Sequence, residues 1–137
     1  MDTTVILETS QRTTAGTIHF PEVVQNLLAA GVEYFHVDYI QRRSTFYSAA
    51  GEVSVTPIDL EGLPEVGADF DSAGLRANIL DSQTKGQNYR DFSVRAMRHG
   101  VQGYYAFLRG RRVTYFGRSG DQHTEWFPGA NPEGGAA

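Results

Sequence analysis

The fold is decided by residues 31–56, GVEYFHVDYIQRRSTFYSAAGEVSVT, because residues 100–125, GVQGYYAFLRGRRVTYFGRSGDQHTE, repeat them without a gap. A shift of 69 positions lays Gly31 on Gly100, and six of the 26 aligned positions are identical. These identities fall on a helix stop, an Arg-Arg pair after a turn, a strand centre and a second turn. Internal similarity at a fixed period is typical of a repeated structural unit. The sequence therefore predicts a tandem duplication.

Each unit is predicted to hold two helices followed by a three-stranded antiparallel meander. Pro21 suits the first turn of a helix, Gly31 suits its end, and an apolar stripe lies between them. Crowded aromatic and β-branched residues after each glycine favour strands. The predicted helices are a weaker one from residue 3 to Gly16, then 20–30, one capped by Asp69 or Asp71 and running to about residue 84, and 89–99. The predicted strands are 32–40, 44–48, 52–56, 101–108, 112–117 and 122–127.

The predicted fold class is α+β, built from two αα-βββ units with six mainly antiparallel strands and helices packed on one side. A meander leaves one bare sheet face, which packing of another layer can cover. A length of 137 residues suits a single domain, here 1–128, with repeat units at about 1–57 and 70–128. The Pro- and Gly-containing segment 57–68 is predicted to connect the two halves. The glycine-rich tail 129–137 is expected to be disordered.

Composition excludes several classes of protein. The formal net charge of −4 and a pI near 5.5 make nucleic acid an unlikely partner, because such proteins usually carry a net basic surface. The absence of cysteine excludes disulfides, thiolate metal sites and a cysteine nucleophile. The sequence has no apolar run of membrane-spanning length, and its first ten residues lack the form of a secretion signal. We therefore expect a soluble cytoplasmic protein without a membrane partner.

Four segments carry a family resemblance: GVEYFHVDY, STFYSAAGE, LRANILDSQ and YFGRSGDQHTEWFPG. Together they resemble the YbcV-like family of small uncharacterised bacterial proteins, some of whose members are labelled phage envelope proteins. The resemblance spans about residues 17–129. It implies a small α+β domain and transfers no activity or catalytic residue.

The first candidate site combines His36, Asp38 and His123. Residues two apart in a strand point to the same face, so His36 and Asp38 are expected side by side with Tyr34. With His123 they can form a divalent-metal site or an acid-base pair. The alternative is that His36 is a partly buried strand residue hydrogen-bonded to a neighbour, and no cofactor or metal is assigned.

The second candidate site is a pair of arginine turns. Arg42 and Arg43 in the first unit correspond to Arg111 and Arg112 in the second, with Tyr105 among the flanking aromatic residues. Arginine interleaved with aromatic rings can hold phosphates and stack bases. The alternative is a solvated turn whose guanidinium groups pair with acids or lie over aromatic rings.

A dense aromatic set near the end completes the candidates. Strand alternation should send half of it to the core, and the remainder can line an apolar pocket or a dimer face. Its members are Tyr104, Tyr105, Phe107, Tyr115, Phe116, Trp126 and Phe127.

The chain has no glycine-rich phosphate loop and no nucleophile-elbow motif. The favoured function is a non-enzymatic binding or interaction module that forms a homodimer or takes a small-molecule ligand. The alternative is a metal-dependent or acid-base enzyme using His36, Asp38 and His123, and a weaker one is single-stranded nucleic-acid binding through the arginine turns.

Overall fold

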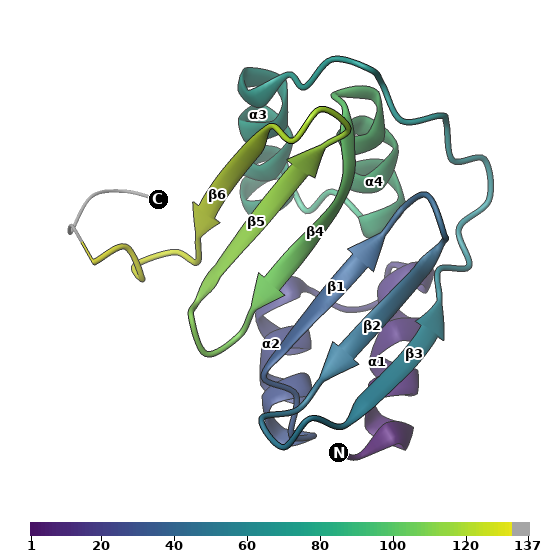
Figure 1. Cartoon of the computed structure of the whole chain (residues 1–137), viewed down its shortest axis with the longest axis vertical. Helices are drawn as coiled ribbons and strands as arrows, with labels where there is room; N and C mark the ends of the chain where they lie inside the picture. Colours follow the sequence, from purple (N-terminus) through teal and green to yellow (C-terminus); the bar gives the residue numbers. More distant parts are fainter. Residues whose placement is uncertain (133–137) are drawn as a thin grey trace.

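The protein is an α+β structure, described by a computed structural model over residues 1–132. The connectivity is two helices and three strands, followed by the same order again (Figure 1). Its elements are α1 (Thr3–Ala15), α2 (Phe20–Ala29), β1 (Tyr34–Asp38), β2 (Arg43–Tyr47), β3 (Val53–Pro57), α3 (Ser72–Thr84), α4 (Tyr89–Arg98), β4 (Val101–Phe107), β5 (Arg112–Gly117) and β6 (Gln122–Trp126).

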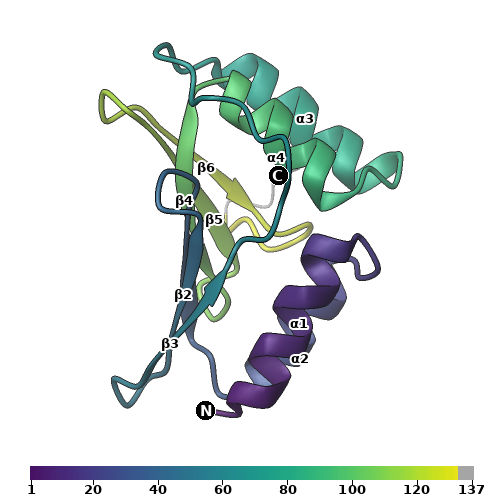
Figure 2. The ribbon, with the colours of Figure 1, turned by 90° about the vertical axis from the view of Figure 1, so that its right-hand side faces the viewer.

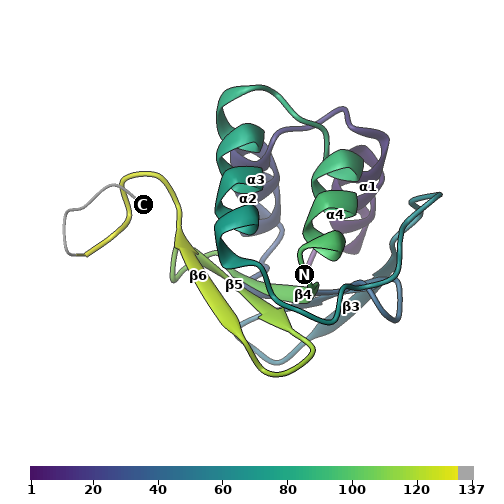
Figure 3. The same cartoon turned by 90° about the horizontal axis from the view of Figure 1, so that it is seen from above.

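The six strands form one antiparallel sheet in the order β3-β2-β1-β4-β5-β6. All four helices cover one face of this sheet, and no helix of the described chain covers the other face (Figures 2 and 3). The predicted α+β class, with six antiparallel strands and helices on one side, is confirmed. We call the two surfaces of the sheet the helix face and the open face.

The two halves have matching elements. Under the shift of 69 positions, α1 lands on α3, α2 on α4 and β3 on β6 with the same bounds. The halves meet where β1 pairs with β4, and the middle pair of that ladder is His36 opposite Tyr105, two positions that the shift also equates. A common origin by duplication stays a prediction, but the two halves place equivalent residues around the centre of the sheet.

Local sequence explains where the helices begin and end. Asp71 caps α3 by accepting a hydrogen bond from the Gly74 amide at 2.9 Å, and Asn88 caps α4 in the same way through the Asp91 amide at 2.8 Å. After α4, Gly100 turns the chain with a φ of 89°, a conformation that favours glycine. The two caps and the turn at Gly100 fix where β4 starts and therefore its register against β1.

The core lies between the helices and the helix face. Alternate strand residues point there, so Phe35, Val37, Phe46, Tyr104 and Tyr115 are buried. The helices contribute apolar side chains to the same cluster, including Ile6, Leu27, Leu75 and Met97. The two helix pairs therefore pack on one shared sheet surface, as expected for a single core.

Three details of the ends and helices complete the fold. The first helix, predicted weakly because of its threonines, is complete, and the Thr13 hydroxyl donates to the Thr9 carbonyl at 2.8 Å. Within the predicted tail 129–137, Ala130 is buried and its amide donates to the Phe127 carbonyl, while 133–137 lie outside the described residues. Within residues 1–132, every helix is too short or too polar to cross a membrane.

Candidate functional site

The open face carries most of the residues predicted for a site. Tyr34, His36 and Asp38 lie there together, as strand alternation predicted. The strand register extends this face across the sheet and places Tyr105 directly beside His36. The other strand residues on the open face include Arg43, Thr45 and Tyr47 in β2, Val53 and Val55 in β3, Gly103 and Phe107 in β4, Arg112, Thr114 and Phe116 in β5, and Gln122, Thr124 and Trp126 in β6.

Stacked rings occupy the middle of the open face. The ring centroids of Tyr34 and Tyr47 are 4.7 Å apart, and those of His36 and Tyr105 are 4.4 Å apart. Burial lowers the pKa of His36 below its usual value of 6.5; nearby Asp38 opposes this shift, and Arg43 adds to it. The lowered pKa favours the neutral imidazole, and His36 is a partly buried strand residue that stacks on Tyr105.

Asp38 has a structural partner at the end of β1. One carboxylate oxygen, Oδ1, accepts hydrogen bonds from the amides of Ile40 and Gln41, at 2.9 and 3.0 Å. These bonds hold the β1–β2 turn in the manner of an Asx turn. This carboxylate is therefore engaged in shaping the hairpin.

His123 lies on the helix face, so the predicted set of His36, Asp38 and His123 is wrong. His123 is in register with Tyr115, whose side chain belongs to the core, and its ring stacks on Tyr115 at 6.4 Å. The sheet itself separates His123 from His36 and Asp38. In the described part of the chain, moreover, no three His, Cys, Asp or Glu residues group in a way that could hold a metal ion.

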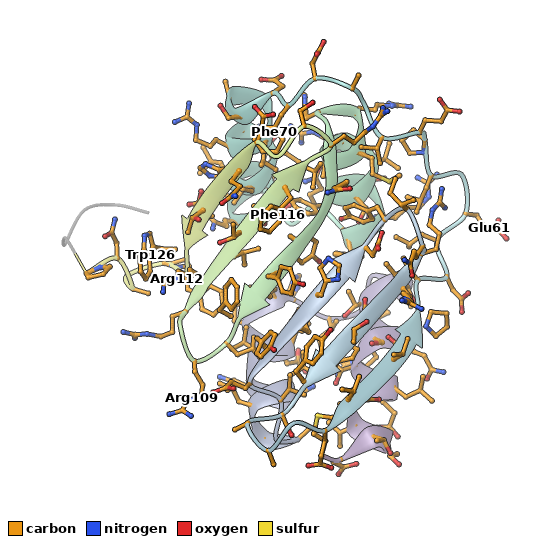
Figure 4. The ribbon with its side chains drawn as sticks, viewed as in Figure 1. Glu61, Phe70, Arg109, Arg112, Phe116 and Trp126 are labelled. Carbon is orange, nitrogen blue, oxygen red and sulfur yellow. The ribbon has the colours of Figure 1, made fainter. Side chains whose placement is uncertain are left out.

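The arginine turns lie at opposite ends of the sheet, because β1 and β4 run in opposite directions (Figure 1). Arg42 and Arg111 occupy the left-handed turn positions with φ of 58° and 56°, and their neighbours Arg43 and Arg112 begin β2 and β5 on the open face. The Arg112 guanidinium lies 4.6 Å from the centre of the Trp126 ring (Figure 4). The two turns therefore form separate sites and not one groove.

A cavity of about 550 Å³ lies on the helix face, between the two helix pairs. The ends of α1 and α3 and the starts of α2 and α4 contribute to its wall, including Thr13, Phe20, Ser82 and Tyr89. Thr13 corresponds to Ser82, and Phe20 to Tyr89, under the shift of 69 positions. The cavity therefore sits where equivalent parts of the two halves converge, and Figure 2 shows the helix pairs that flank it.

Aromatic rings and hydroxyl groups dominate the cavity wall. Rings come from the central strands and from α4, and hydroxyls come from α1, α3 and β2. Among residues 1–132, the wall includes no lysine, arginine or aspartate, and its only charged or chargeable side chains besides tyrosine are His19 and Glu125. The main aromatic members are Phe35, Phe46, Tyr89, Phe92, Tyr104 and Tyr115.

The cavity tyrosines remain protonated. The Tyr89 and Tyr104 hydroxyls are 2.7 Å apart, and burial raises the pKa of both. Burial likewise raises the pKa of Tyr115, with smaller contributions from Tyr89 and Glu125. These phenols are therefore poor proton acceptors, and the Tyr89 and Tyr104 hydroxyls use one of their protons in the bond between them.

The sequence does not predict this cavity as a site, although some late aromatic residues are expected to line a pocket. Tyr104 and Tyr115 were in that aromatic set, whereas Glu125, Thr13 and Ser82 were not singled out. The 3.6- and 2-residue periodicities could identify inward-facing positions. They carry no information about how far apart the two helix pairs stand.

Comparison with known proteins assigns no relative. No protein-family model matches the chain. No curated protein matches it either. The resemblance to the YbcV-like family therefore stays a prediction from the four quoted segments.

Proposed function

We propose that the protein is a non-enzymatic binding module that takes a small molecule into the cavity between its helix pairs. The observation that carries this proposal is the volume of about 550 Å³ beside an aromatic wall. Protein interiors are normally close-packed, and voids larger than a water molecule are few. Ligand pockets typically enclose roughly 300–1,000 Å³ and combine apolar walls with a few polar groups.

The wall favours a guest with planar apolar rings. Ring faces from both the sheet and α4 surround the cavity, and hydroxyls at its edge can orient a polar substituent. An anionic guest is disfavoured, since its charge would be buried without a lysine or arginine in the described wall. The raised pKa of Tyr89, Tyr104 and Tyr115 makes these residues poor general bases, which supports binding over proton-transfer chemistry.

The test uses N-phenyl-1-naphthylamine, a neutral fluorophore whose emission rises in apolar surroundings. Ser44→Trp places a bulky ring on the helix face at the cavity wall, and Thr45→Trp places the same ring on the open face. We expect the wild type and Thr45→Trp to bind the probe and Ser44→Trp to lose it, with both variants folded by circular dichroism. Equal binding by the two variants, or none by the wild type, would contradict the proposal.

A second candidate function is self-association through the open face, with a second copy of the chain as the partner. The strand residues that point to this face include tyrosine, phenylalanine, tryptophan and arginine, one aspartate, and no lysine, glutamate, serine or alanine within residues 1–132. This composition is typical of protein interfaces. In addition, Val53 and Val55 are 57% and 54% exposed, and a facing copy would cover them.

Sedimentation of the wild type and two variants tests this second candidate. Val55→Lys puts a charge on the open face, whereas Leu80→Lys makes the same change at a 56% exposed position on α3. We expect the wild type and Leu80→Lys to sediment as dimers and Val55→Lys as a monomer. A monomeric wild type at high concentration would exclude self-association and leave the cavity proposal untouched.

Family and cellular location are proposed from sequence alone. The four quoted segments support membership in the YbcV-like family, and a cytoplasmic location is part of the same proposal. Cell fractionation followed by detection of the protein checks the location. Recovery in an extracellular or membrane fraction would count against it.

A further inference from the structure

We propose that the preferred guest of the cavity is an organic cation, with an aromatic or aliphatic body among the rings and its positive group against Glu125. This inference rests on the proposed small-molecule binding and names its ligand class. Three features carry it: the position of one carboxylate, the lack of a lysine or arginine in the described wall, and the aromatic rings of the same wall.

The register of β6 on β5 places the Glu125 side chain in the cavity wall. It lies on β6 in register with Val113, a buried residue of β5, so its side chain is on the helix face. The side chain is only 16% exposed, and it forms part of the cavity wall. It is the only aspartate or glutamate in the wall within residues 1–132.

In the described chain, Glu125 forms no ion pair with a lysine or arginine. Within the described chain its sole ion-pair partner is His123, whose Nε2 lies 3.0 Å from Oε1. The arginine nearest in strand register to this end of β6 is Arg112, and its guanidinium lies over the Trp126 ring. A partly buried carboxylate is stabilised by pairing with a positive charge, so a cationic guest gains at this position.

Aromatic rings in the same wall favour the same guest. Tyr115 is in strand register with His123, two residues from Glu125, and its ring lies 5.3 Å from that of Tyr104 and 6.3 Å from that of Phe92. The faces of such rings attract cations through their quadrupoles, most strongly when water is excluded. The wall therefore holds one carboxylate and several aromatic rings, the two kinds of group that recognise ammonium ions.

A matched pair of ligands separates charge from shape. Benzyltrimethylammonium and neopentylbenzene have the same shape, but only the first is charged. Each is used to displace N-phenyl-1-naphthylamine from the full chain. We expect the cation to bind roughly tenfold more tightly than its neutral counterpart, a gain typical of a desolvated cation over aromatic rings with a carboxylate partner.

Variants then assign the preference to Glu125. Glu125→Gln should reduce the preference for the cation, Glu125→Asp should keep it, and the exposed control Glu65→Gln should behave as wild type. Thermal melting confirms that each variant is folded. If the wild type binds the fluorophore and the neutral ligand but does not prefer the cation, this inference fails and the cavity proposal survives. If nothing binds, the cavity proposal itself fails.

Discussion

Replacing Gly100 by alanine should cost more stability than replacing its counterpart Gly31, although the two have φ of 89° and 91°. In both variants a non-glycine residue must adopt a left-handed conformation, which costs roughly 1–2 kcal/mol. The positions differ in their surroundings. A Cβ on Gly31 would lie 3.7 Å from the Met1 Cα, an ordinary contact, whereas a Cβ on Gly100 would collide with the Asp69 carbonyl oxygen.

The backbone that Gly100 approaches cannot move freely. A Cβ there would also come within 2.9 Å of the Phe70 Cα, just before the capping residue of α3. Overpacking of this kind typically adds about 1–3 kcal/mol. We therefore expect Gly31→Ala to destabilise the protein by about 1–2 kcal/mol and Gly100→Ala by about 2–5 kcal/mol.

Urea unfolding followed by far-ultraviolet circular dichroism measures both losses, with an unchanged m-value as the check that only stability has changed. Gly120→Ala is a third variant, because Gly120 has a φ of 89° and open space around its Cα. It should match Gly31→Ala. Equal losses for Gly31→Ala and Gly100→Ala would refute the claim that close approach to the backbone of Asp69 and Phe70 is what requires glycine at position 100.

Three further predictions concern single side chains. NMR should show that the His36 imidazole titrates with a pKa below 6.5. Because the pKa is lower in the folded state than in the unfolded state, the contribution of His36 to stability is present above pH 6.5 and is lost as the pH falls. His36→Gln should make stability less dependent on pH in this range. A hydrogen bond from Arg95, and to a smaller extent one from Lys85, lowers the pKa of Asp81. NMR should therefore give a pKa below 3.8 for this carboxyl, and an unshifted pKa in the wild type would contradict the prediction. Tyr39→Phe removes a fully buried hydroxyl that donates to Ser93, and should cost about 1–3 kcal/mol in urea unfolding, whereas an unchanged midpoint would show that bond to be dispensable.

The fold was largely predictable because its governing signals are local. Pro21, Gly31 and Gly100 mark helix boundaries, and the 2-residue period of the strands identifies which residues share a face. The α+β class, the antiparallel strands and the placement of helices on one side follow from those signals. The shared face of Tyr34, His36 and Asp38 follows from them as well.

The site was less predictable because it depends on relations between distant segments. Whether His123 joins His36 is decided by the register of β6 on β5 and of β4 on β1, which no single strand encodes. The cavity depends on the spacing of two helix pairs. Glu125 was therefore indistinguishable in sequence from an ordinary strand-end glutamate.

The central β1–β4 ladder has a consequence for fragments of this chain. It pairs Tyr34 with Phe107 and Asp38 with Gly103, and the 69-residue offset converts each of these pairs into the other. Each of these two strands therefore pairs with its equivalent in the other half of the chain. An isolated amino-terminal half would therefore present a self-complementary seam, and two such fragments could rebuild a six-stranded sheet without the covalent connection between halves.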